Sequence, residues 1–156
     1  MHVELREGLE NIDQLAFSRC TSLERISIPS TVKVIGKYAF HQCTRLMHVE
    51  LREGLESISN RAFSSCSLLE RISIPSTVKV IGEYAFERCT RLMHVELREG
   101  LERVDEGAFY GCTSLESITI PSTVKVIGSL SFDHCTHLMN VELTEGLESI
   151  NDAAFF

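Results

Sequence analysis

The side chains best suited to chemistry in this chain occur in repeated sets. His48 and Glu50 lie two residues apart, and the same pair returns as His94 and Glu96. An imidazole beside a carboxylate is suited to general acid–base catalysis. Each pair lacks a neighbouring nucleophile, however, and an active site needs its unusual residues only once. The sequence therefore predicts a protein that is not an enzyme.

The cysteines raise the question of disulfides or a zinc site. Six of them recur every 23 residues, at Cys20, Cys43, Cys66, Cys89, Cys112 and Cys135. Each lies three residues after a Phe and three before a Leu or its equivalent, which predicts a free thiol facing an apolar core. Disulfides between successive copies are the less favoured alternative. No C-x-x-C pair occurs, so zinc is not expected.

The segment "SLSFDHCTHLMN" brings several metal-competent side chains close together in sequence. It contains Asp133, His134, Cys135 and His137. The repeat pattern directs Cys135 inward and His134 outward, so one ion would not reach both. We therefore expect no metal ion and no other cofactor.

Composition narrows the classes of partner. The 156 residues include 22 acidic and 15 basic side chains, giving a net charge of −7. No basic run is present, so nucleic acid is not an expected partner. No apolar stretch approaches 18 residues, which predicts no insertion into a membrane. The N-terminus has no signal-peptide pattern, and the compartment is left open.

Two internal periods organise the chain. The nine residues "IPSTVKVIG" occur at 28–36, 74–82 and 120–128, which is a period of 46 residues. Phe recurs every 23 residues, so each 46-residue period holds two kinds of unit. We name them the EGL unit, as in "MHVELREGLESISNRAFSSCSLL", and the IPST unit, as in "ERISIPSTVKVIGEYAFERCTRL". Six full units and 18 residues of a seventh predict one repeat domain over 1–156.

The frame within a unit predicts its local structure. The pattern L-x-x-[IV]-x-[IL] is typical of a short strand with alternate residues buried. A second apolar pair, such as Val32 and Ile35, predicts a shorter second strand. The next residue is Gly, Asp, Ser or Asn, which favours a helical turn carrying Ala-Phe-x-x-Cys. Since no unit can bury its apolar face alone, we expect the units to stack as a solenoid.

This pattern resembles the leucine-rich repeats, and "IPSTVKVIGEYAFERCTRL" resembles the BspA-like subtype over the whole chain. The resemblance implies a right-handed β/α superhelix with a parallel sheet on its concave face. It also implies adhesion or protein interaction, often at cell surfaces. The chain departs from common leucine-rich repeats at Thr31 and Gly54, where an Asn or Cys is usual, so the usual Asn ladder is absent.

The exposed positions of the predicted strands form the first candidate binding surface. A carboxylate row lies between two largely basic rows on this face, which suits a protein partner, although a merely solvated face is the alternative. The candidate residues are His48, Glu50, Arg52, Arg71, Ser73, His94, Glu96 and Arg98.

A flank of the solenoid is the second candidate surface. Apolar pairs repeat there on every second unit and could support self-association as a structural scaffold. The residues are Val34, Tyr38, Val80, Tyr84, Val126 and Leu130. Terminal units without polar caps are a further candidate surface for self-association. Core packing does not explain why Ser30, Thr31 and Lys33 return unchanged, so recent duplication or design is the expected cause.

Overall fold

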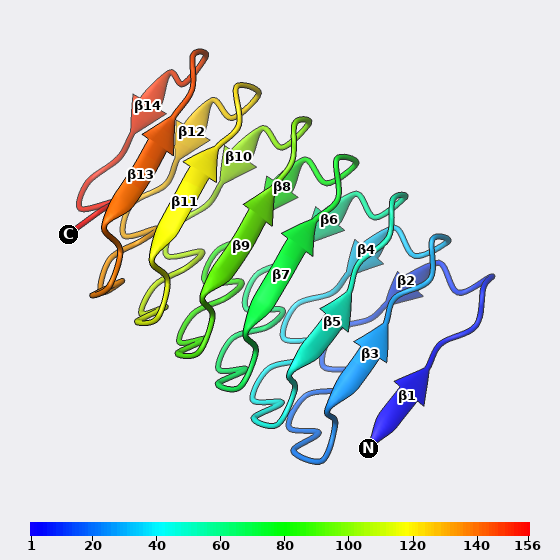
Figure 1. Ribbon diagram of the computed structural model, residues 1–156. Helices are drawn as coiled ribbons and strands as arrows, with labels where there is room; N and C mark the ends of the chain where they lie inside the picture. Colours follow the sequence, from blue (N-terminus) through cyan, green and yellow to red (C-terminus); the bar gives the residue numbers. More distant parts are fainter.

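The computed structural model describes all residues, 1–156, and consists of strands joined by turns (Figure 1). Each 23-residue coil contributes one odd-numbered and one even-numbered strand. The odd-numbered strands are β1 (His2–Glu4), β3 (Arg25–Ser27), β5 (His48–Glu50), β7 (Arg71–Ile74), β9 (His94–Leu97), β11 (Ser117–Ile120) and β13 (Asn140–Leu143). The even-numbered strands are β2 (Asn11–Ile12), β4 (Val34–Ile35), β6 (Ser57–Ile58), β8 (Val80–Ile81), β10 (Arg103–Val104), β12 (Val126–Ile127) and β14 (Ser149–Ile150).

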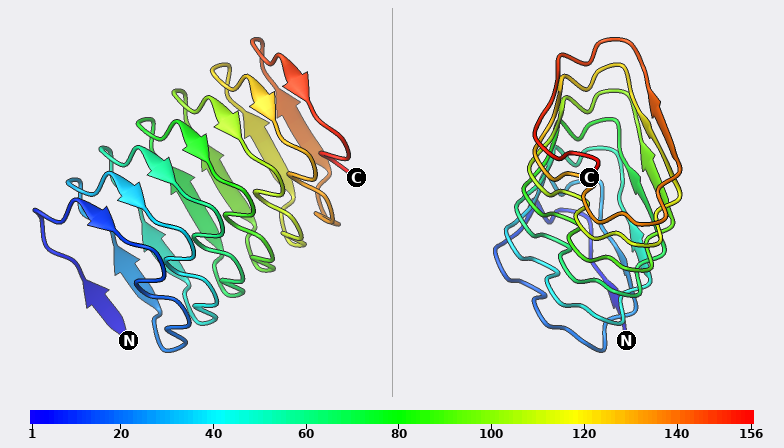
Figure 2. Two further views of the ribbon diagram at one scale, coloured as in Figure 1. Left: turned by 180° about the vertical axis from the view of Figure 1, so that it is seen from behind. Right: turned by 90° about the vertical axis from the view of Figure 1, so that its left-hand side faces the viewer.

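The strands form two parallel layers on opposite sides of a stack of coils (Figure 2). All seven even-numbered strands make one sheet, in which Asn11 pairs with Val34 and each strand is displaced by one 23-residue unit. The odd-numbered strands pair in three ladder segments, β1-β3-β5, β7-β9 and β11-β13. The parallel solenoid predicted from the sequence is therefore confirmed, with two interruptions in one of its layers.

Stacked phenylalanine rings fill the space between the layers. The seven rings from Phe17 to Phe155 lie nearly parallel, with neighbouring centroids 5.0–5.3 Å apart. The five inner rings, from Phe40 to Phe132, belong to a cluster of 37 buried apolar residues, and Phe17 packs against it. The cysteines are free, and five of them donate an S–H bond of 3.0–3.3 Å to a Phe carbonyl in the preceding coil. The predicted inward direction of Cys43 through Cys135 is confirmed, whereas Cys20 in the first coil is half-buried.

The prediction of helical turns, and with it of a β/α superhelix, is wrong. After the second strand of a coil, the chain makes successive β-turns, as in Ala62 N–H to Ser59 C=O and Cys66 N–H to Phe63 C=O, both 3.2 Å. Alternate N–H groups instead donate to the next coil, such as Phe63 to the Ala85 carbonyl at 2.8 Å. A helix would hold those donors within the segment, so it is incompatible with bonding to the neighbour. With no helix in the chain, none is present that is long and apolar enough to cross a membrane.

Candidate interaction surface

The outward side chains of β5, β7 and β9 form what we term the strand face. Side chains alternate between the two sides of a strand, so the residues between the buried ones project together into solvent. This places all eight sequence-predicted residues on one surface, since Arg52 lies two residues after the end of β5 and Arg98 follows directly after β9. Seven of them are exposed, and Ser73 is half-buried. The sequence pattern thus located the surface, while binding at it is a prediction.

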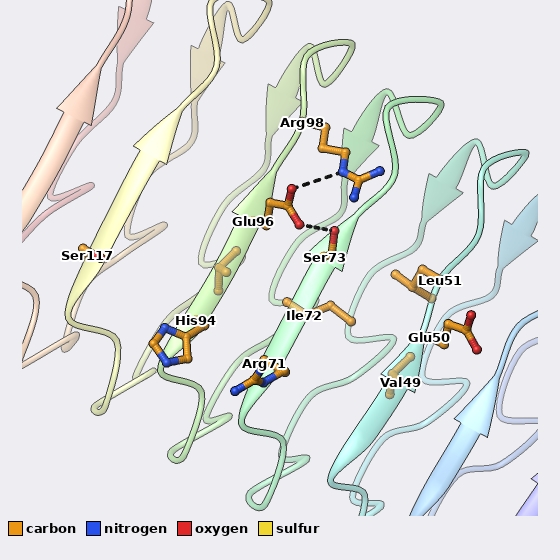
Figure 3. A pocket seen from close by; sticks show the side chains of 11 residues that line it. Val49, Glu50, Leu51, Arg71, Ile72, Ser73, His94, Glu96, Arg98 and Ser117 are labelled. Atoms are coloured by element: carbon orange, nitrogen blue, oxygen red, sulfur yellow. Dashed lines mark hydrogen bonds and ion pairs between the residues drawn. The ribbon is translucent and has the colours of Figure 1, made fainter.

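A shallow groove of about 480 Å³ crosses the strand face (Figure 3). Val49, Ile72 and Val95 form its apolar base, and the predicted polar residues stand around them. The valines are half-buried although the sequence pattern identifies them as core, whereas Ile72 is only 3% exposed. Both valines lie on strands that end a ladder segment, because β5 does not pair with β7, nor β9 with β11. Sequence periodicity carries no sign of these interruptions.

Hydrogen bonds hold the two central carboxylates of the strand face. Glu50 accepts a 2.7 Å bond from the Ser27 hydroxyl, and Glu96 accepts a 2.6 Å bond from the Ser73 hydroxyl. The Nε of Arg98 donates to the other oxygen of Glu96 at 3.3 Å. The hydroxyl bond and the adjacent guanidinium hold the pKa of each carboxyl below its usual range. Both carboxylates therefore stay ionised at neutral pH.

A row of basic side chains runs along the outward side of β3, β5, β7 and β9, and we term it the basic row: Arg25, His48, Arg71 and His94. Its first three residues line a second, smaller groove beside the first. The register places Arg25 beside His48 and Arg71 beside His94, and all four side chains are exposed. Figure 3 shows Arg71 and His94 side by side on neighbouring strands. None of the chain's ion pairs involves a residue of the basic row. Its positive charge is thus available to a partner.

The flank offers less free apolar surface than the sequence predicts. Val34, Val80 and Val126 lie on β4, β8 and β12 and are half-buried. The tyrosines and Leu130 are half-buried as well. The Tyr84 hydroxyl donates a 2.8 Å bond to Glu106, and the Arg61 guanidinium lies 4.6 Å from its ring centre. Tyr84 therefore packs along its own neighbours, which is the alternative interpretation of this surface.

The repeated surface residues of the IPST unit join neighbouring coils. Ser76 donates a 2.9 Å hydroxyl bond to Glu53 of the preceding EGL unit. The Thr77 hydroxyl accepts the Gly54 N–H at 3.0 Å and donates to the Leu55 carbonyl at 2.6 Å. Equivalent threonine bonds occur at Thr31 and Thr123.

The lysine of the IPST unit joins it to the EGL unit that follows. Lys79 donates to the Gly100 carbonyl at 3.2 Å, and its Nζ lies 3.5 Å from a carboxylate oxygen of Glu102. In the first IPST unit, Ser30, Thr31 and Lys33 make the equivalent bonds, so their recurrence has a structural role in addition to the apolar packing of the core. Because all three residues contact neighbouring coils, the alternation of units has a structural cause.

The metal-competent side chains near the C-terminus do not converge. His134 is exposed and pairs with Asp133 at 2.7 Å, while Cys135 is buried and donates to the Phe109 carbonyl. His137 is exposed and contacts the carbonyl of Thr113. No group of three or more His, Cys, Asp or Glu side chains in the chain is arranged to hold a metal ion.

Comparison with known proteins assigns this architecture to a family. The family model described as "BspA type Leucine rich repeat region" matches residues 1–71 and 58–156, in six copies. The chain is 34% identical to the T. pallidum leucine rich repeat protein, with a TM-score of 0.87. The match covers 96% of this chain and 70% of the T. pallidum protein. A comparison with curated proteins found no match. No catalytic family is indicated by these matches.

Two further solved structures show the same fold in longer chains. A Bacteroides ovatus leucine-rich repeat protein is 29% identical with a TM-score of 0.67, over 94% of this chain and 46% of that chain. The pneumococcal vaccine antigen PcpA is 24% identical with a TM-score of 0.71, over 93% of this chain and 43% of that chain. The chain thus spans less than half of either protein.

Proposed function

The chain belongs to the BspA-type leucine-rich repeat family, and from that premise we propose that it is a non-enzymatic interaction or adhesion module that binds a protein partner on its strand face. Leucine-rich repeat domains commonly serve protein interaction or adhesion. A solved structure 25% identical to this chain, from Faecalibacterium prausnitzii, is described as a leucine rich cell surface protein. A role at a cell surface is part of the proposal on that basis.

The groove across β5, β7 and β9 is the observation that supports this proposal. It combines a half-buried apolar base with exposed Arg, His and Glu side chains. Interfaces gain most of their affinity from a few desolvated side chains, among which Arg is enriched, surrounded by polar groups. The even-numbered strands offer no comparable surface, because each is two residues long and its second residue is buried except in β14.

Matched charge reversals test the proposed surface. The double variant Glu50→Lys/Glu96→Lys changes the strand face, whereas Glu116→Lys/Glu145→Lys makes the same charge change at two exposed residues outside the groove. Binding to a panel of purified extracellular and cell-surface proteins is measured by surface plasmon resonance. We expect the first variant to change the affinity for a partner of the unmodified chain, because the charge of the strand face is reversed, and the second variant to leave that affinity unchanged. Equal retention by both variants would exclude the strand face.

Self-association is the second candidate function, and exposed apolar side chains in the last coil support it. Leu143 and Ile150 are each 47% exposed, whereas their counterparts 46 residues earlier are half-buried (Leu97) and buried (Val104). Light scattering over a range of protein concentrations separates the two functions. A molar mass that rises with concentration, and is unchanged in the Glu50→Lys/Glu96→Lys variant, would favour self-association. A constant monomer would leave the strand face as the working surface.

A further inference from the structure

Resting on the proposed function, we infer that the partner presents an acidic segment in the extended polyproline II conformation, with a carboxylate at every third residue, along the basic row. The class of partner follows from charge, and its conformation follows from spacing. The inference goes beyond protein binding in general, because it specifies what the bound segment must carry and how far apart.

Charge complementarity identifies the segment as acidic. Arg25 and Arg71 are exposed and form no ion pair, whereas Arg52 and Arg98 of the neighbouring row pair with Glu50 and Glu96. The chain as a whole carries a net charge of −7, so the two free guanidiniums make the basic row a locally positive strip on an acidic molecule. A guanidinium binds a carboxylate well because its planar donors match the two oxygens.

Spacing identifies the conformation. Successive coils lie 5.0–5.3 Å apart at the phenylalanine stack, so Arg25 and Arg71, two coils apart, are separated by about 10 Å. A polyproline II helix rises about 3.1 Å per residue with three residues per turn, which places residues i and i+3 on one side about 9.3 Å apart. In a β-strand, residues on one side recur after about 6.8 Å, which matches neither one coil nor two.

The same spacing brings the histidines of the basic row into contact with the bound segment. His48 and His94 lie one coil beyond Arg25 and Arg71, respectively. Each carboxylate of the segment would therefore meet one guanidinium and one imidazole. The two intervening residues of each turn can then lie toward the apolar base formed by Val49 and Val95.

The carboxylate row fixes the side on which the segment lies. Glu50 and Glu96 are held ionised by the hydroxyls of Ser27 and Ser73, which lower the pKa of each carboxyl. An acidic segment is repelled from these two residues and attracted to the basic row beside them. A basic segment would meet the reverse arrangement, with the carboxylates already engaged by Arg52 and Arg98.

Two peptides of identical composition test the spacing. The peptide (Glu-Pro-Pro)₄ is preorganised in polyproline II and places Glu at every third residue. Its permutation Glu-Pro-Glu-Pro-Glu-Pro-Glu-Pro-Pro-Pro-Pro-Pro has the same charge and length but no pair of Glu residues three apart. Fluorescence anisotropy at low ionic strength measures the Kd of each labelled peptide, with (Lys-Pro-Pro)₄ as a charge control.

Matched variants of the protein test the location. Arg25→Gln/Arg71→Gln removes the two free guanidiniums of the basic row, while Arg19→Gln/Arg91→Gln removes two exposed arginines that line neither groove over the odd-numbered strands. We expect (Glu-Pro-Pro)₄ to bind at least about tenfold more tightly than its permutation. We also expect the first variant alone to lose about tenfold in affinity, as for two exposed ion pairs.

The outcomes separate this inference from the proposed function. Equal binding of the two acidic peptides, or equal loss in both arginine variants, would overturn it, as would binding of (Lys-Pro-Pro)₄ with similar affinity. Failure of every peptide, while a panel protein still depends on Glu50 and Glu96, would reject the acidic segment and keep the strand face. If no peptide binds and no panel protein depends on Glu50 and Glu96, both the acidic segment and the proposed strand-face function would be rejected.

Discussion

Residues that repeat at the same 23-residue interval differ in what surrounds them. Phe63 is fully buried between the rings of Phe40 and Phe86, at centroid distances of 5.0 and 5.3 Å. Tyr84 is half-buried and keeps its hydroxyl bonded to Glu106 at the surface. Burial, and not aromatic character alone, therefore determines how much each ring contributes to stability.

Truncation of these two rings should have unequal effects. Phe63→Ala leaves a cavity in the stack and is expected to cost about 3–5 kcal/mol in the free energy of unfolding. Tyr84→Ala is expected to cost much less, because its ring is already in contact with solvent. Urea denaturation followed by circular dichroism measures both. Equal losses would contradict the assignment of Phe63 to the interior and Tyr84 to the surface.

Alkaline pH should destabilise the protein through its buried thiols. Burial raises the pKa of the Cys89 thiol from 9.0 to about 12. The neutral thiol is thus favoured in the folded state. Its contribution is complete below pH 9 and is lost as pH rises from 9 toward 12.

The comparison of pH 7.5 with pH 10 tests this effect. Urea denaturation of the unmodified chain should show a lower free energy of unfolding at pH 10. One buried thiol accounts for about 1.4 kcal/mol over one pH unit above its unfolded pKa. Cys89→Ala should reduce the pH-dependent loss by that amount. An identical loss in the variant would show that this thiol titrates normally in the fold.

The segment of turns that follows the second strand of each coil is the element for which the sequence-based prediction was wrong. Phe and Cys three residues apart fit one face of a helix, but they fit two successive β-turns equally well. The difference lies in the backbone, where Ser65 has φ 61° and Arg61 has φ 56°. These left-handed conformations free alternate N–H groups for the next coil. Glycine is the residue type that usually indicates a left-handed conformation, and most residues at these positions are not Gly. The residue types therefore did not predict a left-handed turn.

Two reciprocal substitutions measure the strain in this turn. Ser65 and Gly111 occupy equivalent positions, and Gly111 has φ 70°. A Cβ added at Gly111 would come no closer than 3.5 Å to Arg88, so Gly111→Ala tests conformation without a clash. It is expected to cost about 1–2 kcal/mol.

The reverse change at Ser65 should stabilise the protein. Ser65→Gly removes the left-handed strain but adds the chain entropy of glycine, leaving a net gain below about 1 kcal/mol. Thermal and urea denaturation compare both variants with the unmodified chain. If Gly111→Ala were neutral, the left-handed conformation would not be a significant constraint on the turn.

At the scale of the whole molecule, periodicity was the reliable signal. The spacing of Phe and Cys gave the stacked coils, the two strands per coil and the common face of Glu50 and Glu96. It could not give the interrupted ladder, because this depends on how the backbones of neighbouring coils pair. The repeat pattern does not identify the partner either, because some surface charges repeat for structural reasons and not for binding.

The alternating coils also determine how such an array can change in length. An IPST unit bonds through Ser76 and Thr77 to the EGL unit before it and through Lys79 to the one after it. Deleting or duplicating a single 23-residue unit would therefore place two like coils together and leave their loop bonds unmade. Unequal recombination in steps of 46 residues preserves every junction. The unit of duplication in this protein is consequently the pair of coils. Related arrays should therefore differ in length by multiples of two coils.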